Sequence, residues 1–416
     1  MKALYVVGSC LRCNTSANMS HNGYVQGLIE NGFEVDIIME NISFGEVDNA
    51  MPVFREANYF EYNSVPFSNK LKNKVKKRVD APVQQSVQAP PAGAQQENRP
   101  VTGRARLRKI LKKLYTVFLH RDHPYLLDKK WLKSAARFKS DTLYDVVISN
   151  SSPASGHKLV SILKRKNHIK YKKWIQIWED PWYYDLYATK KKEAVWKEER
   201  HLLEQADEIY YVSPLTLENQ KKYFKSCAAK MRFIPLPYLV TDRDALEGSN
   251  EEQPLQISFG YFGDYYSHVR NLRPFYQALC RSGASGYICG DTNEHFTSTE
   301  QVKIFGRLTL EKLNPIQKKT SVLVHLSNVK GGQIPGKIYH YSATNKPILF
   351  ILDGTAQEQE KIVQYFKPYN RFYFCSNETD AILQTIQKFL QKEIPLQAKP
   401  LEDFSPYHVV KTLLWR

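Results

Sequence analysis

A Pro-Gly pair followed directly by a lysine marks the segment of this chain best suited to hold an anion. Pro335 and Gly336 stand where a helix would begin, Lys337 follows them, and Asn345 and Pro347 stand where the helix would end. Such a helix start presents free backbone N–H groups and the positive end of the helix dipole, to which the lysine adds a full charge. We therefore expect a phosphate-binding site. An ordinary capped helix on a parallel sheet would carry the same signals.

Short apolar runs alternate with helical segments along the chain, which predicts parallel α/β layers. Ligands of open α/β sheets bind beyond the carboxyl ends of the strands, so the strands decide where the candidate residues lie. The sequence contains no GxGxxG fingerprint, which disfavours a dinucleotide oxidoreductase. The runs predicted as strands are 3–7, 34–39, 145–149, 173–178, 208–212, 231–234, 256–261, 287–289, 302–305, 321–326, 347–351 and 371–374.

The length of 416 residues exceeds what one hydrophobic core supports, so two domains are expected. Pro235-Leu236-Pro237 and the acidic, polar stretch 241–254 are typical of a connection between domains. We predict an N-terminal Rossmann-like domain over residues 1–238 and a C-terminal Rossmann-like domain over residues 239–400, facing each other across a cleft. A final helix within 401–416 would pack back on the first domain.

The segment 320–349 resembles the donor-binding segment of GT-B glycosyltransferases, particularly those of glycosyltransferase family 4. Two glutamates of the family pattern are missing, because Gly332 and His340 stand in their places. The second of these glutamates holds the nucleotide ribose in the family. The resemblance therefore implies either that the neutral His340 ring accepts a ribose hydrogen bond or that the donor is held differently. The positions that fit the pattern are Tyr341, Ala343, Lys346 and Pro347.

The first half of the chain resembles the same family, with its motifs in the same order. Residues 144–157 form a strand and a small-residue loop that ends in His157, and residues 174–182 form a strand that ends in an Asp-Pro-Trp motif. Glu179 stands where the family has an arginine before that motif. Residues 206–213 and 260–263 match two further motifs. Together these resemblances cover nearly the whole chain except residues 60–135.

The resemblance implies that the C-terminal domain binds a nucleotide-sugar donor with no metal or other cofactor. Arg270 and Lys337 would stabilise the diphosphate leaving group, and glycines would let the backbone approach the substrates. The residues expected around the donor are Gly263, Arg270, Gln333, Gly336, Lys337 and His340, and those expected in the acceptor loops are Gly8, Asn22 and Gly23.

His157 and Asp180 are the candidate catalytic residues. If the reaction inverts the anomeric centre, one of them must take the proton of the acceptor hydroxyl. Family 4 enzymes retain the configuration, which implies no protein base of that kind. Simpler interpretations exist for both candidates and for Arg270. In these, His157 is an ordinary residue at a helix start, Asp180 is the cap of a turn before Pro181, and Arg270 is a solvated loop cation.

The formal net charge of +17 is concentrated in one insertion of the N-terminal domain. Residues 70–133 contain 17 Lys and Arg against four Asp and Glu, so this insertion carries 13 of the 17 charges. Its Pro-, Gln- and Ala-rich part, 80–103, is expected to be disordered or a mobile loop. Residues 104–119 have the spacing of a basic amphipathic helix, which would dock on an anionic membrane or pack on the domain with a solvated basic face. Nucleic acid is not expected, since no recognition motif accompanies the charge.

The six cysteines are scattered, so we expect reduced thiols, and the Cys10–Cys13 pair is better explained by loop packing than by a metal or redox site. No apolar run approaches the roughly 20 residues of a membrane span. The resemblance implies a transferase that moves a sugar from a nucleotide donor to a saccharide acceptor during assembly of a bacterial surface glycan. The expected location is the cytoplasm, at the inner face of the plasma membrane if the acceptor is lipid-linked. The alternatives are a GT-B nucleotide-sugar epimerase and a catalytically silent GT-B-like binding or scaffold protein.

Overall fold

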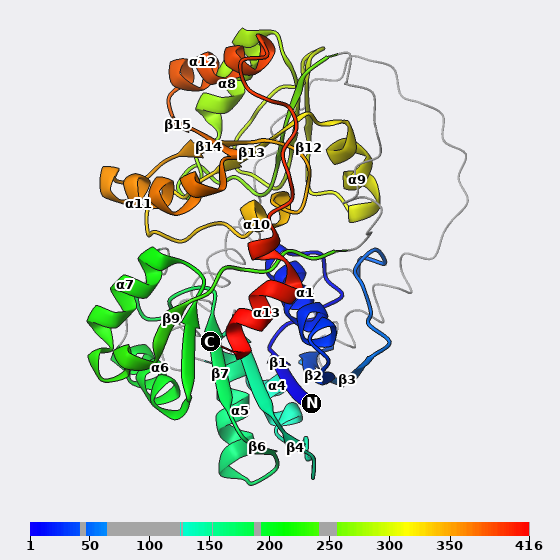
Figure 1. The fold of residues 1–416 in the computed structure, drawn as a ribbon, viewed down its shortest axis with the longest axis vertical. Coiled ribbons are helices and arrows are strands. Elements are labelled where there is room, and N and C mark those ends of the chain that lie inside the picture. Colours follow the sequence, from blue (N-terminus) through cyan, green and yellow to red (C-terminus); the bar gives the residue numbers. More distant parts are fainter. Residues whose placement is uncertain are drawn as a thin grey trace, which may run out of the picture.

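The computed structural model describes residues 1–41, 47–64, 125, 128–151, 153–186, 193–240 and 256–415. Figure 1 shows two α/β lobes stacked along the long axis, the N-terminal lobe below and the C-terminal lobe above. The predicted mobile loop 80–103 and the predicted basic helix 104–119 lie outside the described residues. Within the described part of the chain, the cysteines are free thiols and no helix has the length and apolar character needed to cross a bilayer.

The N-terminal lobe is built on a seven-stranded parallel sheet with the order β3-β2-β1-β5-β7-β8-β9. The central strands β5 and β7 are buried along their whole length, as expected for parallel strands covered by helices on both faces. The strand order reverses between β1 and β5, which creates the switch point where such sheets bind ligands. The strands are β1 Lys2–Val7, β2 Glu34–Glu40, β3 Ala57–Tyr62, β5 Val146–Ser151, β7 Trp174–Trp178, β8 Glu208–Tyr211 and β9 Met231–Phe233, and a separate pair is formed by β4 Leu143–Tyr144 and β6 Lys170–Tyr171.

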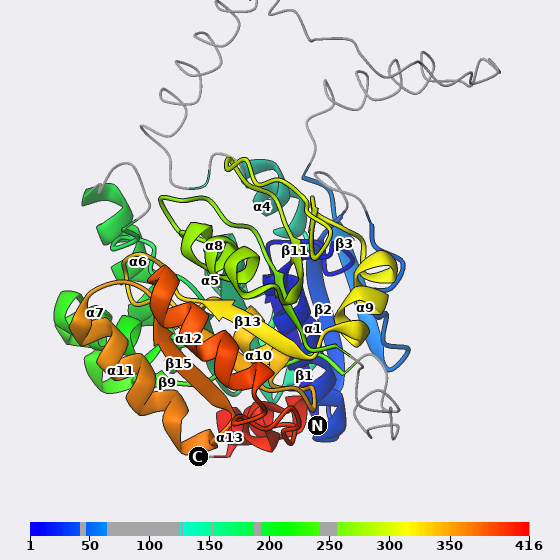
Figure 2. The same cartoon turned by 90° about the horizontal axis from the view of Figure 1, so that it is seen from above.

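The C-terminal lobe contains a six-stranded parallel sheet with the order β12-β11-β10-β13-β14-β15. Its switch point lies between β10 and β13, which pair in register from Phe259 with Val322. The helices α8 and α12 lie side by side on one face of this sheet (Figures 1 and 2) and bury their apolar sides against its strands. The strands are β10 Ser258–Phe262, β11 Ser285–Cys289, β12 Val302–Phe305, β13 Val322–Leu326, β14 Ile348–Leu352 and β15 Phe372–Ser376.

The helices of the described residues connect these strands, and several begin with a side-chain cap. Thr15 accepts a hydrogen bond from the Asn18 N–H at the start of α1, and Thr355 and Glu358 form a capping box at the start of α11. The helices are α1 Ser16–Glu30, α4 Lys129–Ala135, α5 Ser155–Arg165, α6 Glu193–Gln205, α7 Pro214–Tyr223, α8 Arg273–Ser282, α9 Leu310–Lys319, α10 Lys337–Tyr341, α11 Ala356–Phe366, α12 Thr379–Leu390 and α13 Pro406–Leu414, with 3₁₀ turns η1 Lys225–Lys230, η2 Lys367–Tyr369 and η3 Glu402–Phe404.

The predicted α/β class is confirmed, and all twelve runs predicted as strands are strands whose ends differ by at most two residues from the prediction. The edge strand β3 was not predicted. Its sequence, Ala-Asn-Tyr-Phe-Glu-Tyr, has no fully buried position, so it lacks the continuous apolar run that marks a central strand.

The last helix of the chain crosses to the N-terminal lobe and packs on α1 (Figure 1). The two helices approach so closely at Gly27 that a Cβ atom there would lie 2.2 Å from the Pro406 carbonyl oxygen. Glycine is therefore required by the close contact at this position, at the usual cost of a glycine inside a helix. The chain thus leaves the C-terminal lobe and is anchored to the lobe in which it started.

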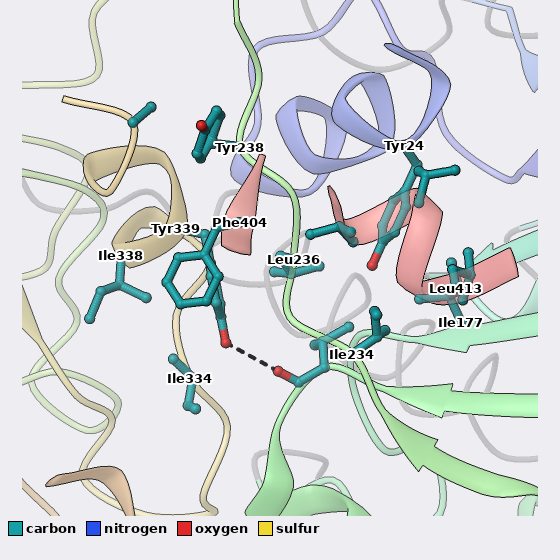
Figure 3. Packing of buried hydrophobic residues seen from close by; sticks show 14 of the residues in the cluster. Tyr24, Ile177, Ile234, Leu236, Tyr238, Ile334, Ile338, Tyr339, Phe404 and Leu413 are labelled. Carbon is teal, nitrogen blue, oxygen red and sulfur yellow. Dashed lines mark hydrogen bonds between the residues drawn. The ribbon is translucent and has the colours of Figure 1, made fainter. Parts of the chain in front are cut away.

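A single apolar cluster continues from one lobe into the other. Figure 3 shows Tyr339 and Phe404 packed near Leu236 and Ile234 of the connecting segment, with Tyr24 of α1 beyond them. The Tyr339 hydroxyl donates a hydrogen bond to the Val212 carbonyl oxygen over 3.4 Å, which ties α10 to the end of β8. Because these side chains are buried, apolar surface is removed from water at the lobe interface, which stabilises this arrangement of the two sheets.

Candidate active site

Two adjoining cavities lie between the lobes, beyond the carboxyl ends of the strands in both sheets. Their volumes are about 390 Å³ and 270 Å³, and both are lined by Ser16, Arg270, Pro335 and Gly336. The larger one, which we call the acidic cavity, carries three carboxyl groups of the N-terminal lobe: Glu179, Asp180 and Asp185. The smaller one, which we call the cationic cavity, carries Arg270, Arg307 and Lys337 of the C-terminal lobe.

The three cations of the cationic cavity are held in different ways. Arg270 donates to the Asp264 carbonyl oxygen at 2.8 Å and to Asn328 Oδ1 at 3.0 Å, so the β10 and β13 loops fix its guanidinium. Arg307 is paired with the carboxylates of Asp264 and Asp291. The three cations together form a concentration of positive charge suited to a diphosphate.

Lys337 has a lowered pKa. Burial and the neighbouring Arg307 charge lower the pKa of its ammonium group to about 8. Among the described residues its ammonium forms no ion pair. A bound diphosphate would supply the missing negative charge.

The helix α10 is shorter than predicted, because it ends at Tyr341 rather than near Asn345. Arg371 takes carbonyl groups that would continue it, because its guanidinium donates to the carbonyl oxygens of Tyr341 and Ser342. A helix of five residues has few aligned peptide dipoles. Anion binding here must therefore depend mainly on charged side chains, with a smaller contribution from the helix start than the sequence suggests.

The acidic cavity brings the predicted residues Asp180 and Gln333 together across the cleft. Gln333 Nε2 donates a hydrogen bond of 2.6 Å to Asp180 Oδ1, which links the loop after β13 to the loop after β7. The Asp180 side chain meets the water of the cleft but is surrounded by both lobes. This enclosure and the Asp185 charge raise its pKa to about 6.

Glu179 also lines the acidic cavity, although it was not among the predicted site residues. Its side chain is 9% exposed, and burial together with the Asp180 charge raises its pKa well above the usual range of a glutamic acid. Behind it, His21 Nδ1 lies 3.6 Å from Glu179 Oε1 and 3.0 Å from the Tyr5 hydroxyl. Burial lowers the pKa of His21 to about 3, so this support is polar but uncharged.

His157 is not among the residues that line either cavity. Its ring is fully buried against Trp178, with centroids 4.3 Å apart, and its Nδ1 lies 2.8 Å from the Ser149 hydroxyl. Burial lowers its pKa to about 3. The start of α5 thus turns this side chain toward the sheet, and only Asp180 of the two predicted catalytic residues reaches the cavity.

The predicted loop residues Gly8, Asn22 and Gly23 also lie outside the cavity walls. Asn22 donates to the carbonyl oxygens of Leu11 and Asn18, and an added Cβ at Gly23 would lie 2.6 Å from the Tyr238 carbonyl oxygen. At Gly8, an added Cβ would lie 2.6 Å from the hydroxyl oxygen of Ser155, the first residue of α5. These residues hold the loop in place, whereas those that reach the cavities are Asn14, Thr15, Ser16 and Ala17, which precede or open α1. The Asn-Thr-Ser run of a helix start is the signal that could have found them.

The structure gives a reason for the glycine at the first missing glutamate position. Gly332 has φ +64°, and an added Cβ would lie 2.8 Å from the Leu215 Cβ. Its carbonyl oxygen accepts a hydrogen bond of 2.6 Å from Ser213. A glutamate side chain does not fit at this close contact between the lobes.

His340 faces α1 rather than lining a cavity. Its Nε2 lies 3.3 Å from the Ser16 carbonyl oxygen and 3.5 Å from the Ser20 hydroxyl. Because a carbonyl oxygen only accepts, Nε2 carries the proton, and the buried Nδ1 has no hydrogen-bond partner among the described residues. The ring therefore connects α10 to the loop that lines both cavities.

We expect His340→Glu to be more damaging than His340→Gln, since a carboxylate would face the Ser16 carbonyl oxygen whereas an amide can still donate to it. The expected loss is roughly 1–3 kcal/mol of stability for glutamate and under about 1 kcal/mol for glutamine. Urea unfolding and calorimetric titration with UDP would measure both effects. If glutamate instead strengthens nucleotide binding, His340 occupies the ribose-binding position of the family glutamate.

No protein-family model matches this chain, and no curated protein matches it. Solved structures do: sucrose-phosphate synthase from Thermosynechococcus elongatus is 14% identical over 99% of this chain and 94% of its own, with a TM-score of 0.54. AviGT4, a glycosyltransferase involved in avilamycin A biosynthesis, is 11% identical over 99% and 96%, with a TM-score of 0.52. The fold is GT-B. A UDP-N-acetylglucosamine 2-epimerase candidate from Listeria monocytogenes is 9% identical over 100% and 95%, with a TM-score of 0.50. At these identities the likeness establishes the GT-B fold alone.

Proposed function

We propose that this protein is a glycosyltransferase that moves a sugar from a nucleotide-sugar donor to a saccharide acceptor. The observation that carries the proposal is the pair of adjoining cavities with opposite charge, joined at Ser16 and Gly336. A nucleotide sugar has the same arrangement of chemistry, with an anionic diphosphate next to a hydroxyl-rich sugar. The GT-B fold and the glycosyltransferase name of one structural neighbour, AviGT4, support the choice.

The chain's own cations account for departure of the leaving group. As the bond to the sugar breaks, negative charge grows on the diphosphate, and Arg270, Arg307 and Lys337 would stabilise it without a metal ion. The resemblance to family 4 favours retention of configuration, so Asp180 is proposed to hold the substrate rather than to remove a proton. The bacterial surface-glycan role of the product also rests on this resemblance.

A nucleotide panel tests the proposal directly. UDP, GDP, CDP and dTDP are added in turn, and one of them is expected to raise the midpoint of thermal unfolding, because a ligand that binds only the folded state stabilises it by mass action. The corresponding nucleotide sugar should then release its nucleoside diphosphate when saccharide acceptors are present. Binding of none of the four nucleotides would overturn the proposal.

A second candidate function is nucleotide-sugar epimerisation, which the carboxyl groups directly beyond the cationic cavity and the epimerase neighbour favour. Proton magnetic resonance of the donor separates the two. An epimerase changes the sugar without needing an acceptor, whereas a transferase needs one. Nucleotide binding with neither outcome would identify a catalytically silent binding or scaffold protein.

Docking on an anionic membrane is proposed from the sequence of residues 104–119, since a lipid-linked acceptor would require it. Replacing Arg106, Lys109, Lys112 and Lys113 together with glutamate should abolish pelleting with phosphatidylserine vesicles at low salt, because each basic residue near such a surface contributes about 1 kcal/mol. Activity on a soluble acceptor should persist. Equal pelleting of wild type and variant would show that these charges do not bind the membrane and would favour a soluble acceptor.

A further inference from the structure

The sugar of a bound donor must lie in the acidic cavity if the proposed function holds. Its diphosphate is held by the cationic cavity, and the two cavities share Ser16, Arg270, Pro335 and Gly336 as a common wall. Of the two groups that this diphosphate joins, the hydroxyl-rich sugar fits the carboxyl groups of Glu179 and Asp180 better than the nucleobase does. Which sugars the acidic cavity accepts is inferred from its charge, and this inference rests on the proposed function.

Glu179 offers a hydrogen-bonding group that the protein itself does not satisfy. Its side chain is more than nine-tenths buried and lines the cavity, and its Oε1 has no hydrogen-bond partner among the described residues. The nearest polar atom behind it, His21 Nδ1, is 3.6 Å away, beyond hydrogen-bond distance. Oε1 is thus enclosed on the His21 side, and because Glu179 lines the acidic cavity, its carboxyl group is available to a ligand hydroxyl there.

Ser16 provides a second unsatisfied group at the junction of the cavities. Its buried hydroxyl oxygen has no partner among the described residues, and it lies 3.0 Å from where a Cβ of Gly336 would stand. The absence of a side chain at Gly336 thus leaves the hydroxyl next to the shared wall. Two separate elements, the start of α1 and the loop after β7, therefore contribute polar residues to the wall of one cavity.

The charge of the cavity decides what those groups can bind. Asp180 is deprotonated above its pKa of about 6, and Asp185 lies close enough to raise that pKa by charge repulsion. Arg270 is the cation that lines this cavity, and it also lines the cationic cavity, where the proposed function assigns its charge to the bound diphosphate. A carboxylate on the sugar would face like charges with no cation provided for it, and such an arrangement rejects a ligand.

We propose that the acidic cavity is a sugar-binding subsite selective for an uncharged sugar, in which Glu179, Asp180 and Ser16 bind hydroxyl groups and the carboxylates exclude uronic acids. The family pattern has a cation in place of Glu179, so this selectivity belongs to the present chain.

Matched donors that differ only in charge test the proposal. UDP, UDP-glucose and UDP-glucuronic acid are titrated calorimetrically into wild type, Asp180→Asn and the double variant Asp180→Asn with Asp185→Asn at pH 7.5. Wild type is expected to bind UDP-glucose at least about tenfold more tightly than UDP-glucuronic acid, and the double variant should lose most of that preference. UDP alone should bind all three proteins within about twofold, since the cationic cavity is unchanged.

The titrations distinguish failure of the proposed subsite from failure of the proposed function. If GDP rather than UDP is bound, GDP-mannose and GDP-mannuronic acid form the matched pair. Nucleotide binding with equal affinity for the two sugars, or a preference that survives in the double variant, overturns the selective subsite only. Failure of every nucleotide to bind overturns the proposed function and the subsite with it. Asp180→Asn alone guards against misfolding of the double variant, and it should lower the preference in the same direction.

Discussion

Lys337→Ala is expected to weaken nucleoside diphosphate binding by about 10- to 150-fold. Lys337 lines the cationic cavity, and among the described residues its ammonium forms no ion pair. Removing a charged hydrogen bond to a phosphate costs roughly 1.5–3 kcal/mol, and every 1.4 kcal/mol corresponds to about tenfold in affinity. Calorimetric titration with the nucleotide identified by the panel measures the loss, and circular dichroism verifies the fold. Unchanged affinity in a folded variant would contradict the assignment of this cavity to the diphosphate.

The pH dependence of nucleotide binding tests the role of Lys337 independently. Because the pKa of Lys337 is lowered to about 8, the free protein loses this charge as the pH rises through 8. Affinity should therefore fall by up to about tenfold per pH unit above that value. Lys337→Arg is the matched control, since an arginine stays charged and its affinity should remain level over the same range. A wild-type affinity that is level to pH 9.5 would show that the ammonium does not contact the ligand.

Lys337 is also expected to reduce the stability of the free protein. Its folded pKa lies below the ordinary lysine value of 10.5, so the unfolded chain binds the proton more strongly than the folded protein. The stability linked to this group is complete above pH 10.5 and is lost as the pH falls through 8. Without nucleotide, Lys337→Ala should therefore unfold at a higher temperature than wild type at pH 7.

Arg371→Met is expected to lower the free energy of unfolding by roughly 3–5 kcal/mol, because it removes the charged partner of several buried groups. The guanidinium is 2% exposed and donates to four backbone carbonyl oxygens. These belong to Tyr341, Ser342, Lys346 and Lys399, at distances of 2.6 to 3.3 Å. Burial lowers the pKa of Arg371 to about 10, so the group remains charged at neutral pH. Methionine would fill the space but remove the guanidinium from all four oxygens, of which those of Tyr341 and Ser342 still accept from the Thr344 and Leu401 N–H groups.

Urea unfolding measures this loss, and Arg273→Met is the control on the same lobe. Arg273 pairs with Glu294 at the surface, where such a pair contributes under about 1 kcal/mol. Since Arg371 ends α10 and also holds the segment leading to α13, its loss should weaken nucleotide binding as well. A stability within about 1 kcal/mol of wild type for Arg371→Met would show that water can replace the guanidinium at these carbonyl groups.

The sequence by itself determined the α/β class and the central strands of both sheets. A parallel strand such as β14 is covered on both faces, so all of its residues are apolar and the run is visible without any knowledge of its neighbours. The cleft loops followed from the same pattern, because ligands bind where such strands end. Arg270, Gln333, Gly336, Lys337 and Asp180 were located in this way and line the cavities.

The tertiary structure alone decided which side chains of those loops reach the cavities. His157 and Asp180 both follow a strand of the same sheet, yet one turns into the core against Trp178 and the other meets Gln333 from the opposite lobe. The order of residues along the chain does not reveal that difference. Asp180 meets Gln333 only because the fold brings together two segments more than 150 residues apart. The length of α10 could not be predicted for the same reason. Its last carbonyl groups are bound by Arg371, which directly precedes β15 and lies about 30 residues later in the chain. The role of Glu179 likewise became visible only when burial left its carboxyl group beside a cavity without a partner.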